Sequence, residues 1–466
     1  MRITNFLKRT ALLTLGITAF LSHPVMAQES DVMEQADGYE WPTDKEVLNK
    51  LEAWQDLKFG VLFHWGVYAV PGICESWPLC NEDWINRDTT VTYQDYKKWY
   101  WGLSKVFNPI KFNPNQWADV MAKAGMKYMI FTTKHHDGFC LFDTKQTTYS
   151  IAKDGPFRNH PQKDVAKYVF QAFRDKNFMI GAYFSKPDWH SQYYWWDYRA
   201  TKDRNVNYDI KRYPQRWDHF KSFVYNQIEE LMTGYGSVDI LWLDGGQVCP
   251  QNNQDIDMPK IAKMGRSHQP GLLVVDRTIG GKYENYQTPE RSIPETQLNH
   301  PWESCLPLTG MWGWVPNAHF QPAQNVLSSL IEVVAKGGSM VLGVGPTPEG
   351  LIEPGVIEVL NKVGKWMDKN GRAIYHTRTT PYYNDGNMWF TVSKDHQKMY
   401  AICTVKEGEE IPNILEWTEK RLQKGQKVRL VSNGKSLRWT LTDDKIKVYL
   451  PKEVDRTMPV ALEISL

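Results

Sequence analysis

Asp244 is the residue of this sequence that is best placed to do chemistry. It directly follows the apolar run 238–243 and precedes two glycines, which would let a substrate approach the backbone closely. A carboxylate in that position can act as a nucleophile or as a general base. The alternative is an aspartate that only caps the next helix, as many turn aspartates do.

Other apolar runs also end in polar or aromatic side chains. These side chains, at or just after the run ends, are His64, His135, His136, Tyr183, Trp242 and Arg277. In a barrel of parallel strands, the residues that do chemistry lie just past the C-terminal ends of the strands. One such residue means little, but five runs that share the pattern favour a common active site over coincidence.

We expect no metal and no cofactor at this site. His135 and His136 are adjacent, but neighbours on a strand point to opposite faces, and a metal pair on one strand needs the spacing HxH. Neither HxH nor HExxH occurs, and the six cysteines include no CxxC pair. Hydrogen bonds from the imidazoles to substrate hydroxyl groups fit better. Cys74 and Cys80 are close enough to bridge, but two thiols are an equal alternative.

The elements that must position these residues are those of a (β/α)-type barrel. Short apolar runs alternate with helix-like stretches, and the runs are 59–63, 128–132, 178–184, 238–243, 272–275 and 339–344. Runs that are apolar on both faces are typical of parallel strands buried under helices. No GxGxxG or phosphate-loop motif favours an open nucleotide-binding sheet. Strands six and seven are hard to find between residues 280 and 335, which leaves room for an irregular barrel.

The pattern changes after Gly371. Short strand-like runs separated by Gly, Asn and Asp turns predict a C-terminal antiparallel β-sandwich. A positive start, an apolar run at 11–21 and small residues before Gln28 predict a cleaved signal peptide. The predicted organisation is therefore a signal peptide at 1–27, a catalytic barrel at 28–372 and the β-sandwich at 373–466.

Composition narrows the class of protein. The chain has 466 residues and a net charge of +2, which argues against a nucleic-acid binder. Aromatic residues reach 13%, which fits either a large core or rings that stack on the apolar faces of sugars. No later apolar run is long enough to span a membrane. Together with this, the predicted signal peptide leads us to expect a periplasmic or secreted protein.

Several motifs in order resemble the α-L-fucosidase family of retaining glycoside hydrolases. They are FGVLFHWGVYAVPG (59–72), KYMIFTTKHHDGF (127–139), DILWLDGG (239–246), PWESC (301–305) and GGSMVLGVGPTPEGLI (337–352). The resemblance covers about residues 50 to 375. It implies a (β/α)-type barrel with a C-terminal β-sandwich, and it gives Asp244 the role of nucleophile.

The resemblance also implies binding roles for residues around Asp244. His64, His135, His136, Tyr183, Trp242 and Arg277 match sugar-binding positions. Glu75 resembles an acid that binds fucose hydroxyls, although Ser76 separates it from Trp77 where the family more commonly has a Glu-Trp pair. Trp84 is therefore a rival for the role of Trp77.

Two glutamates are candidates for the second catalytic group, the acid/base. Glu290 lies in YQTPE and Glu303 in PWES. We prefer Glu303, because its neighbour Trp302 could help to raise the pKa of a carboxylic acid and because PWES resembles the acid/base motif of bacterial members. The alternative for either glutamate is a surface or salt-bridged side chain.

The function implied is that of an exo-acting α-L-fucosidase, which releases L-fucose from fucosylated oligosaccharides through a covalent fucosyl-enzyme. Two alternatives stay open. One is another retaining exo-glycosidase on the same barrel, such as a galactosidase. The other is a carbohydrate-binding protein that has lost catalysis, against which the presence of Asp244 and two candidate acids argues.

Overall fold

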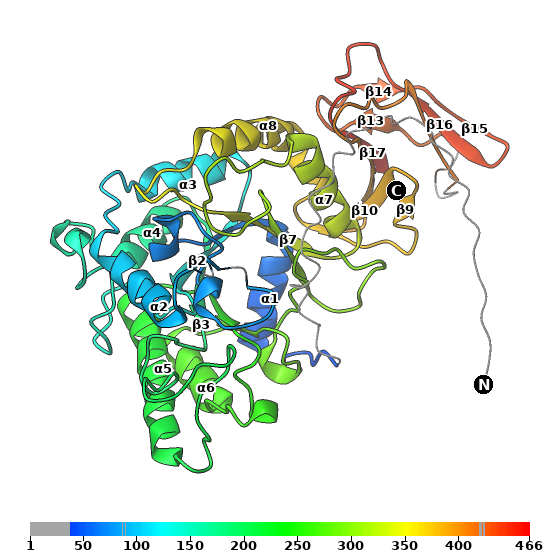
Figure 1. Cartoon of the computed structure of the whole chain (residues 1–466). Coiled ribbons are helices and arrows are strands. Elements are labelled where there is room, and N and C mark those ends of the chain that lie inside the picture. The colour runs from blue at the N-terminus through cyan, green and yellow to red at the C-terminus, as the bar shows by residue number, and fades with distance from the viewer. Residues whose placement is uncertain (1–37, 86, 89, 419–421, 423–424) are drawn as a thin grey trace, which may run out of the picture. The chain divides into compact units, whose positions relative to one another are not determined.

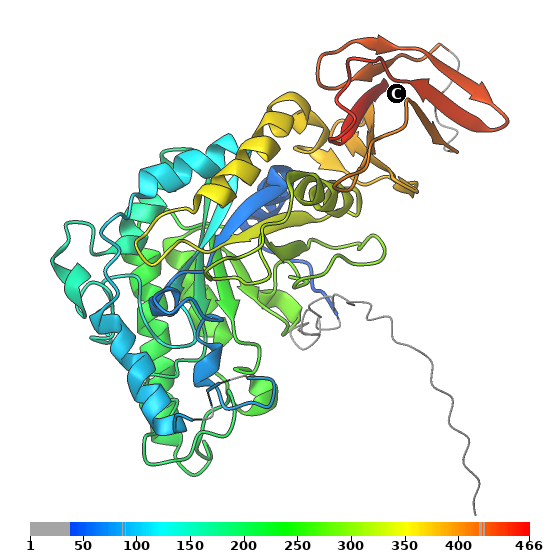
Figure 2. The ribbon, with the colours of Figure 1, turned by 45° about the horizontal axis from the view of Figure 1, so that its top comes forward.

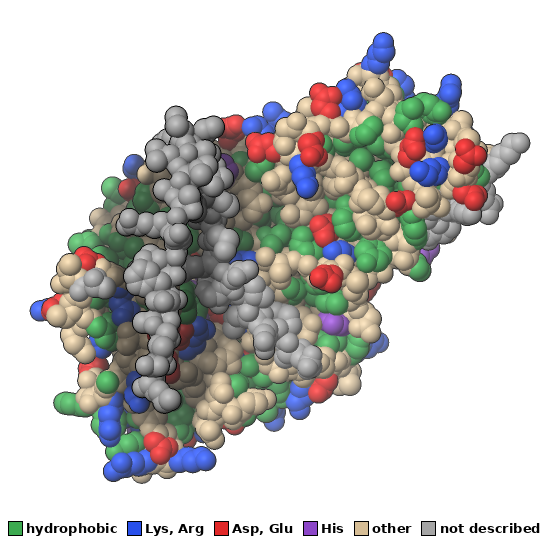
Figure 3. All heavy atoms as spheres, turned by 45° about the vertical axis from the view of Figure 1, so that its right-hand side comes forward, with side chains coloured by type: hydrophobic (Ala, Val, Ile, Leu, Met, Phe, Trp, Pro, Cys, Tyr) green, Lys and Arg blue, Asp and Glu red, His purple; other side chains and the backbone are tan. Residues whose placement is uncertain are grey.

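The computed structural model describes residues 38–85, 87–88, 90–418, 422 and 425–466. The predicted signal peptide lies outside the described residues, and the boundary between residues 372 and 373 stays a prediction. Within the described ranges, no helix is both long enough and apolar enough to cross a membrane. Figure 3 shows one face of the molecule, on which basic and acidic side chains are interspersed.

Seven parallel strands form a curled sheet enclosed by helices (Figure 1). Their order in the sheet is β5-β4-β3-β2-β1-β7-β6. The strands are β1 (Phe59–Phe63), β2 (Tyr128–Lys134), β3 (Met179–Ser185), β4 (Ile240–Asp244), β5 (Leu273–Asp276), β6 (Glu303–Pro307) and β7 (Ser339–Val344). All residues of β1, β2, β4, β5 and β7 are buried, as expected for parallel strands covered on both faces.

Amphipathic helices cover the sheet. They are α1 (Lys45–Leu57), α2 (Tyr93–Gly102), α3 (Pro114–Lys123), α4 (Val165–Arg174), α5 (Pro214–Gly234), α6 (Met258–His268), α7 (Ala323–Ala335) and α8 (Pro354–Asn370). In α4, for example, Val165, Val169 and Phe173 recur every four residues and are buried, so one face of the helix packs inward. The predicted (β/α)-type barrel is confirmed.

The barrel is irregular where its two edge strands face each other. The segment 284–291 lies between β5 and β6 in place of a regular eighth strand. Glu284 forms a bridge with Val275 of β5, and Glu290 forms a bridge with Cys305 of β6. We did not predict β6, because it begins with Glu303 and Ser304 and so lacks the apolar run that marks the other strands.

Helix α1 contributes side chains to the interior of the barrel. Leu51 and Trp54 belong to the same core cluster as Tyr128 and Trp242, which come from the strands. The Trp54 ring stacks on Tyr286, with centroids 4.0 Å apart. The space inside the sheet is therefore a packed core, and only the layer of side chains above it can form an active site.

The C-terminal residues form two antiparallel sheets (Figure 2, orange to red). Their strands are β8 (Thr377–Arg378), β9 (Asn384–Asp385), β10 (Met388–Ser393), β11 (Lys398–Cys403), β12 (Ile414–Trp417), β13 (Val428–Leu430), β14 (Ser436–Leu437), β15 (Trp439–Thr442), β16 (Lys445–Tyr449) and β17 (Val460–Ser465). Phe390 of one sheet packs on Trp417 of the other in a shared core, which confirms the predicted β-sandwich. Strand β17 was not predicted from the sequence, because Glu463 interrupts its apolar run.

Candidate active site

Asp244 is the last residue of β4, and its side chain lies in the uppermost layer of the barrel interior. Trp242, two residues earlier, points in the same direction one layer below, because side chains alternate along a strand. The turn that follows requires glycine at position 245. Gly245 has φ +92°, and a Cβ atom there would lie 2.3 Å from Pro187.

Three side chains surround the Asp244 carboxylate. Arg277 Nη1 donates to Oδ1 at 2.8 Å, and the Tyr183 hydroxyl donates to Oδ2 at 2.5 Å. His136 Nε2 lies 3.7 Å from the same Oδ2. Burial by itself would raise the pKa of Asp244, but the charge of Arg277 and the neighbouring His136 and Tyr183 hold that pKa well below its ordinary value. Asp244 is thus an ionised carboxylate held by side chains, and these contacts do not make it a helix cap.

Arg277 joins Asp244 to a second carboxyl group, that of Glu290. Its Nη2 atom donates to Glu290 Oε2 at 2.7 Å, and Trp312 Nε1 donates to the other oxygen at 3.0 Å. The side chains of Asp244 and Glu290 keep 11% and 13% of their surface exposed, so a ligand can reach both. Since one guanidinium bridges them, the two carboxyl groups fit the short separation of about 5 Å that retaining glycosidases use.

Three imidazoles form one wall of the site. The ring of His135 lies 4.4 Å from that of His136 and 5.6 Å from that of His64, centroid to centroid. Our expectation that His135 and His136 point to opposite faces is wrong, because β2 ends at Lys134 and both residues belong to the following turn. Burial lowers the pKa of all three histidines, that of His135 to about 4, so the rings are neutral near pH 7. A neutral imidazole can both donate to and accept from a hydroxyl group.

The loop after β1 brings Glu75 and Ser76 to this wall. Ser76 Oγ and His135 Nδ1 share a hydrogen bond of 2.5 Å, which gives a role to the residue that departs from the Glu-Trp pattern. Glu75 is 1% exposed, has φ +25° and accepts a hydrogen bond of 2.6 Å from the Gly313 amide. A non-glycine residue held at positive φ in a buried loop is typical of functional sites.

Trp77 and Trp84 lie side by side near the site. The Trp77 ring is 4.9 Å from His136 and 5.3 Å from the Trp84 ring, centroid to centroid. Trp84 Nε1 donates to Glu82 at 2.8 Å, and Glu82 also binds Arg204. Trp77 therefore contacts the histidine wall directly, and Trp84 contacts the Trp77 ring.

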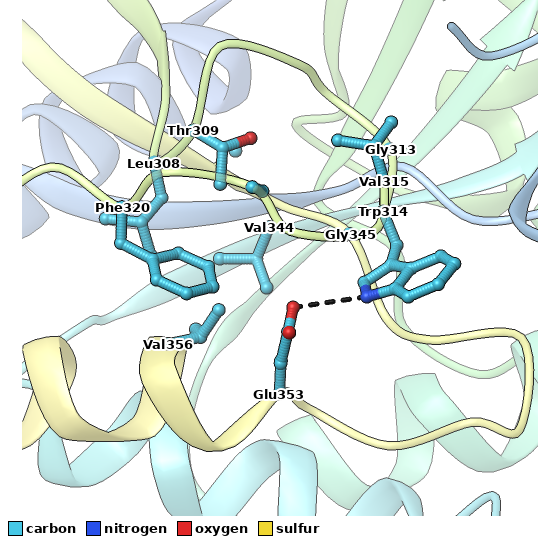
Figure 4. Close-up of a pocket in the computed structure, with 12 residues that line it drawn as sticks. Leu308, Thr309, Gly313, Trp314, Val315, Phe320, Val344, Gly345, Glu353 and Val356 are labelled. Carbon is cyan, nitrogen blue, oxygen red and sulfur yellow. Dashed lines mark hydrogen bonds between the residues drawn. The ribbon is translucent and has the colours of Figure 1, made fainter. Parts of the chain in front are cut away.

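The loop after β6 supplies two groups that were not predicted from the sequence, Trp312 and Gly313. Trp312 binds Glu290, and its ring lies 5.3 Å from that of His64. The next tryptophan anchors the loop, since Trp314 Nε1 donates to Glu353 at 3.1 Å beside a small pocket (Figure 4). The run MWGW at 311–314 could have indicated these residues, because aromatic side chains that follow a strand suit a sugar site. It was not used because the strand before it was not predicted.

Glu303 lies outside the layer of side chains that contains Asp244 and Glu290. It is the first residue of β6, at the opposite end of the strand from the active-site layer, and it is 0% exposed. Tyr128 and Trp242 donate hydrogen bonds of 2.8 and 3.2 Å to its two oxygens. Burial raises the pKa of Glu303 to about 7. Trp302 packs in the core between sheet and helices, whereas Glu303 faces the barrel interior, so the geometry favours Glu290 over our preferred Glu303.

Ligand atoms of His135, His136 and Asp244 lie within 4.8 Å of one another, a set that could hold a metal ion. However, Arg277 and Tyr183 already bind the Asp244 carboxylate, and a guanidinium disfavours a second cation beside it. The expectation of a metal-free site stays a prediction. Cys74 and Cys80 form no disulfide, and Cys74 Sγ instead contacts Glu75 at 3.4 Å.

The fold and the site together define a class of protein. A barrel that places an ionised carboxylate, a second carboxyl group bridged to it and a wall of neutral imidazoles at the ends of its strands has the parts of a retaining glycoside hydrolase.

The comparisons identify the family. The family model described as Alpha-L-fucosidase matches residues 26–372, so the chain belongs to the α-L-fucosidase family. Human plasma α-L-fucosidase is 26% identical over 443 residues, which is 88% of each chain. The structure resembles α-L-fucosidase isoenzyme 1 from Paenibacillus thiaminolyticus, with TM-score 0.72 and 26% identity over 90% of this chain and 99% of that one. It also resembles Thermotoga maritima α-fucosidase in complex with fucose, with TM-score 0.71 and 26% identity over 92% and 100%.

Proposed function

We propose that this protein is an exo-acting retaining α-L-fucosidase that releases L-fucose from fucosylated oligosaccharides. The observation that carries the proposal is the chain of contacts Asp244–Arg277–Glu290 at the open end of a barrel that belongs to this family. It supplies the two carboxyl groups that double displacement needs, joined through one guanidinium group.

In the first step, an Asp244 oxygen attacks the anomeric carbon of fucose. The bond from that carbon to the leaving oxygen breaks, and Glu290 gives its proton to the leaving oxygen. In the second step, Glu290 takes a proton from water while the water oxygen attacks the anomeric carbon and displaces Asp244. Two inversions give net retention. Glu290 takes the acid/base role here because its carboxyl group, unlike that of Glu303, is partly exposed beside Asp244.

The remaining groups suit the binding of a small polyol. Neutral His64, His135 and His136 can hydrogen-bond hydroxyl groups in either direction, and Glu75 adds an acceptor. Trp77 and Trp312 offer rings to the apolar face of a sugar. Arg277 keeps Asp244 ionised, which a nucleophile requires.

Product stereochemistry tests this function. Proton NMR of the first minutes of hydrolysis of an aryl α-L-fucoside should show α-fucose before mutarotation produces the β anomer. An aryl β-D-galactoside in a parallel reaction should stay intact. Release of β-fucose first would contradict double displacement, and turnover of the galactoside alone would favour the other exo-glycosidase.

We also propose that the protein is exported to the periplasm or secreted. The support is the sequence of residues 1–27, with a basic start followed by an apolar run. Expression of the full chain, cell fractionation and N-terminal sequencing of the mature form should give a protein that begins at Gln28 outside the cytoplasm. A cytoplasmic protein that retains Met1 would contradict export.

A further inference from the structure

We propose that Glu303 is a positioning residue that holds Trp242 in place beneath the catalytic groups. This inference rests on the proposed function and adds a positioning residue to it. It assigns a task to a buried carboxyl group that the mechanism itself does not use.

The position of Glu303 excludes it from direct contact with substrate. Asp244 ends β4 at the open edge of the barrel, whereas Glu303 begins β6. Strands β4 and β6 run in the same direction in one parallel sheet, so these two residues lie toward opposite ends of it. The side chain of Glu303 is enclosed by Tyr128, Trp242 and Cys305, and the residue is 0% exposed.

Trp242 connects Glu303 to the side chains that bind Asp244. Its indole N–H donates to Glu303 Oε1 at 3.2 Å, and the other parts of the ring contact the two side chains that bind Asp244. Tyr183 stacks on the ring with centroids 5.2 Å apart, and the guanidinium carbon of Arg277 lies 4.3 Å from the ring centroid. The orientation of one indole therefore affects both donors to the Asp244 carboxylate.

An apolar residue at position 303 could not replace this carboxyl group. The Tyr128 hydroxyl and the Trp242 N–H both point at it from inside the core, and the loss of their acceptor would leave two buried donors without a partner. Glutamine has the same shape and keeps a carbonyl oxygen for Trp242. It cannot, however, give a proton to a leaving group or take one from water.

Glutamine and alanine at position 303 separate the two roles. We expect Glu303→Gln to keep kcat/KM within about threefold of wild type, because the hydrogen bonds survive. Glu303→Ala should lose about 10- to 100-fold, by the same factor on an aryl α-L-fucoside and on a fucosylated oligosaccharide. Neither variant should respond to azide. Trp242→Phe is the matched variant. Because phenylalanine has no N–H for the carboxyl group to hold, Glu303→Ala should cost distinctly less in that background than in the wild type.

Three results would overturn the proposal. The first is a Glu303→Gln variant as inactive as Glu303→Ala, with the loss concentrated on the oligosaccharide and relieved by azide, because that pattern belongs to an acid/base. The second is near-normal activity of Glu303→Ala, which would leave Glu303 without any role. The third is a loss from Glu303→Ala that is equally large in the wild type and in the Trp242→Phe background. If Glu303→Ala does not fold, the activity of the glutamine variant and its response to azide decide. Failure of the wild-type protein to release fucose would instead contradict the proposed function.

Discussion

Two adjacent segments of the barrel, 284–291 and β6, each bring a glutamate inward. The two carboxyl groups nevertheless differ in depth and in hydrogen-bond partners. Glu290 forms a bridge with Cys305, which lies two residues beyond Glu303 along β6. Two residues of a strand amount to about 7 Å, so Glu290 reaches the active-site layer and Glu303 stays below it. A difference of one layer in a barrel is therefore enough to separate a group that can touch substrate from a group of the core.

The partners of the two glutamates differ in charge as well as in depth. Glu290 faces the guanidinium of Arg277, whereas the hydrogen-bond donors of Glu303 are the neutral Tyr128 and Trp242. Burial without an ion pair favours the uncharged form of a carboxylic acid. The same side chain can thus serve as a reactive group in one layer and as a neutral hydrogen-bonding group in the next, and variants can separate these roles.

The largest loss of activity should follow a change in the uppermost layer of the barrel interior, the top layer, which contains Asp244. Asp244→Ala should reduce kcat by several orders of magnitude, because the covalent intermediate cannot form. Azide should restore turnover of an activated aryl fucoside and give a fucosyl azide of inverted configuration. The fold should survive, which circular dichroism can check. Near-normal activity of the alanine variant would remove Asp244 from the mechanism.

The next effect concerns Glu290. Glu290→Ala should cost about 10² to 10⁴ in kcat/KM on a fucosylated oligosaccharide and much less on an aryl fucoside, since a good leaving group departs without a proton. Azide should speed the second step and give a fucosyl azide of retained configuration. Parallel measurements on Glu303→Ala provide the control. An azide response in that variant, and none in Glu290→Ala, would exchange the two roles.

The sequence predicted several residues of the uppermost layer but did not predict how the residues beneath it are arranged. Asp244, His64 and Arg277 could be predicted because each follows a strand that is a plain apolar run. The choice between Glu290 and Glu303 could not be predicted, because it depends on where β6 begins and on an irregular segment that acts as a strand. Both features are set by pairing between distant parts of the chain, which local patterns do not record. Trp312 was not predicted for the same reason, because it follows β6, which was not recognised as a strand.

A smaller effect concerns stability rather than turnover. Burial raises the pKa of Glu303 in the folded protein to about 7 from an ordinary 4.5, so the folded state holds its proton more tightly than the unfolded state does. This contribution is fully present below pH 4.5 and is lost as the pH rises through about 7. Glu303→Gln does not titrate. Relative to wild type, it should therefore gain about 3 kcal/mol in the free energy of unfolding between pH 4.5 and pH 8.

Urea unfolding of both proteins at the two pH values measures this difference. Asp244→Asn is the control from the top layer. The pKa of Asp244 is depressed in the folded protein, so its contribution is lost only in more acidic solution, and the difference from wild type should change little between pH 4.5 and pH 8. A gain by Asp244→Asn as large as that of Glu303→Gln would contradict the electrostatic contrast between the two layers.

The smallest effect should follow metal removal. Although atoms of His135, His136 and Asp244 come within 4.8 Å of one another, the Asp244 carboxylate is already bound by Arg277. A divalent cation there would displace or face a buried guanidinium, and repulsion between like charges at such distances is costly in a site that water reaches poorly. Dialysis against EDTA should therefore leave kcat/KM unchanged, and added zinc should not increase it. Loss of activity that zinc or calcium restores would show that the top layer works by a metal ion and would require a different role for Arg277.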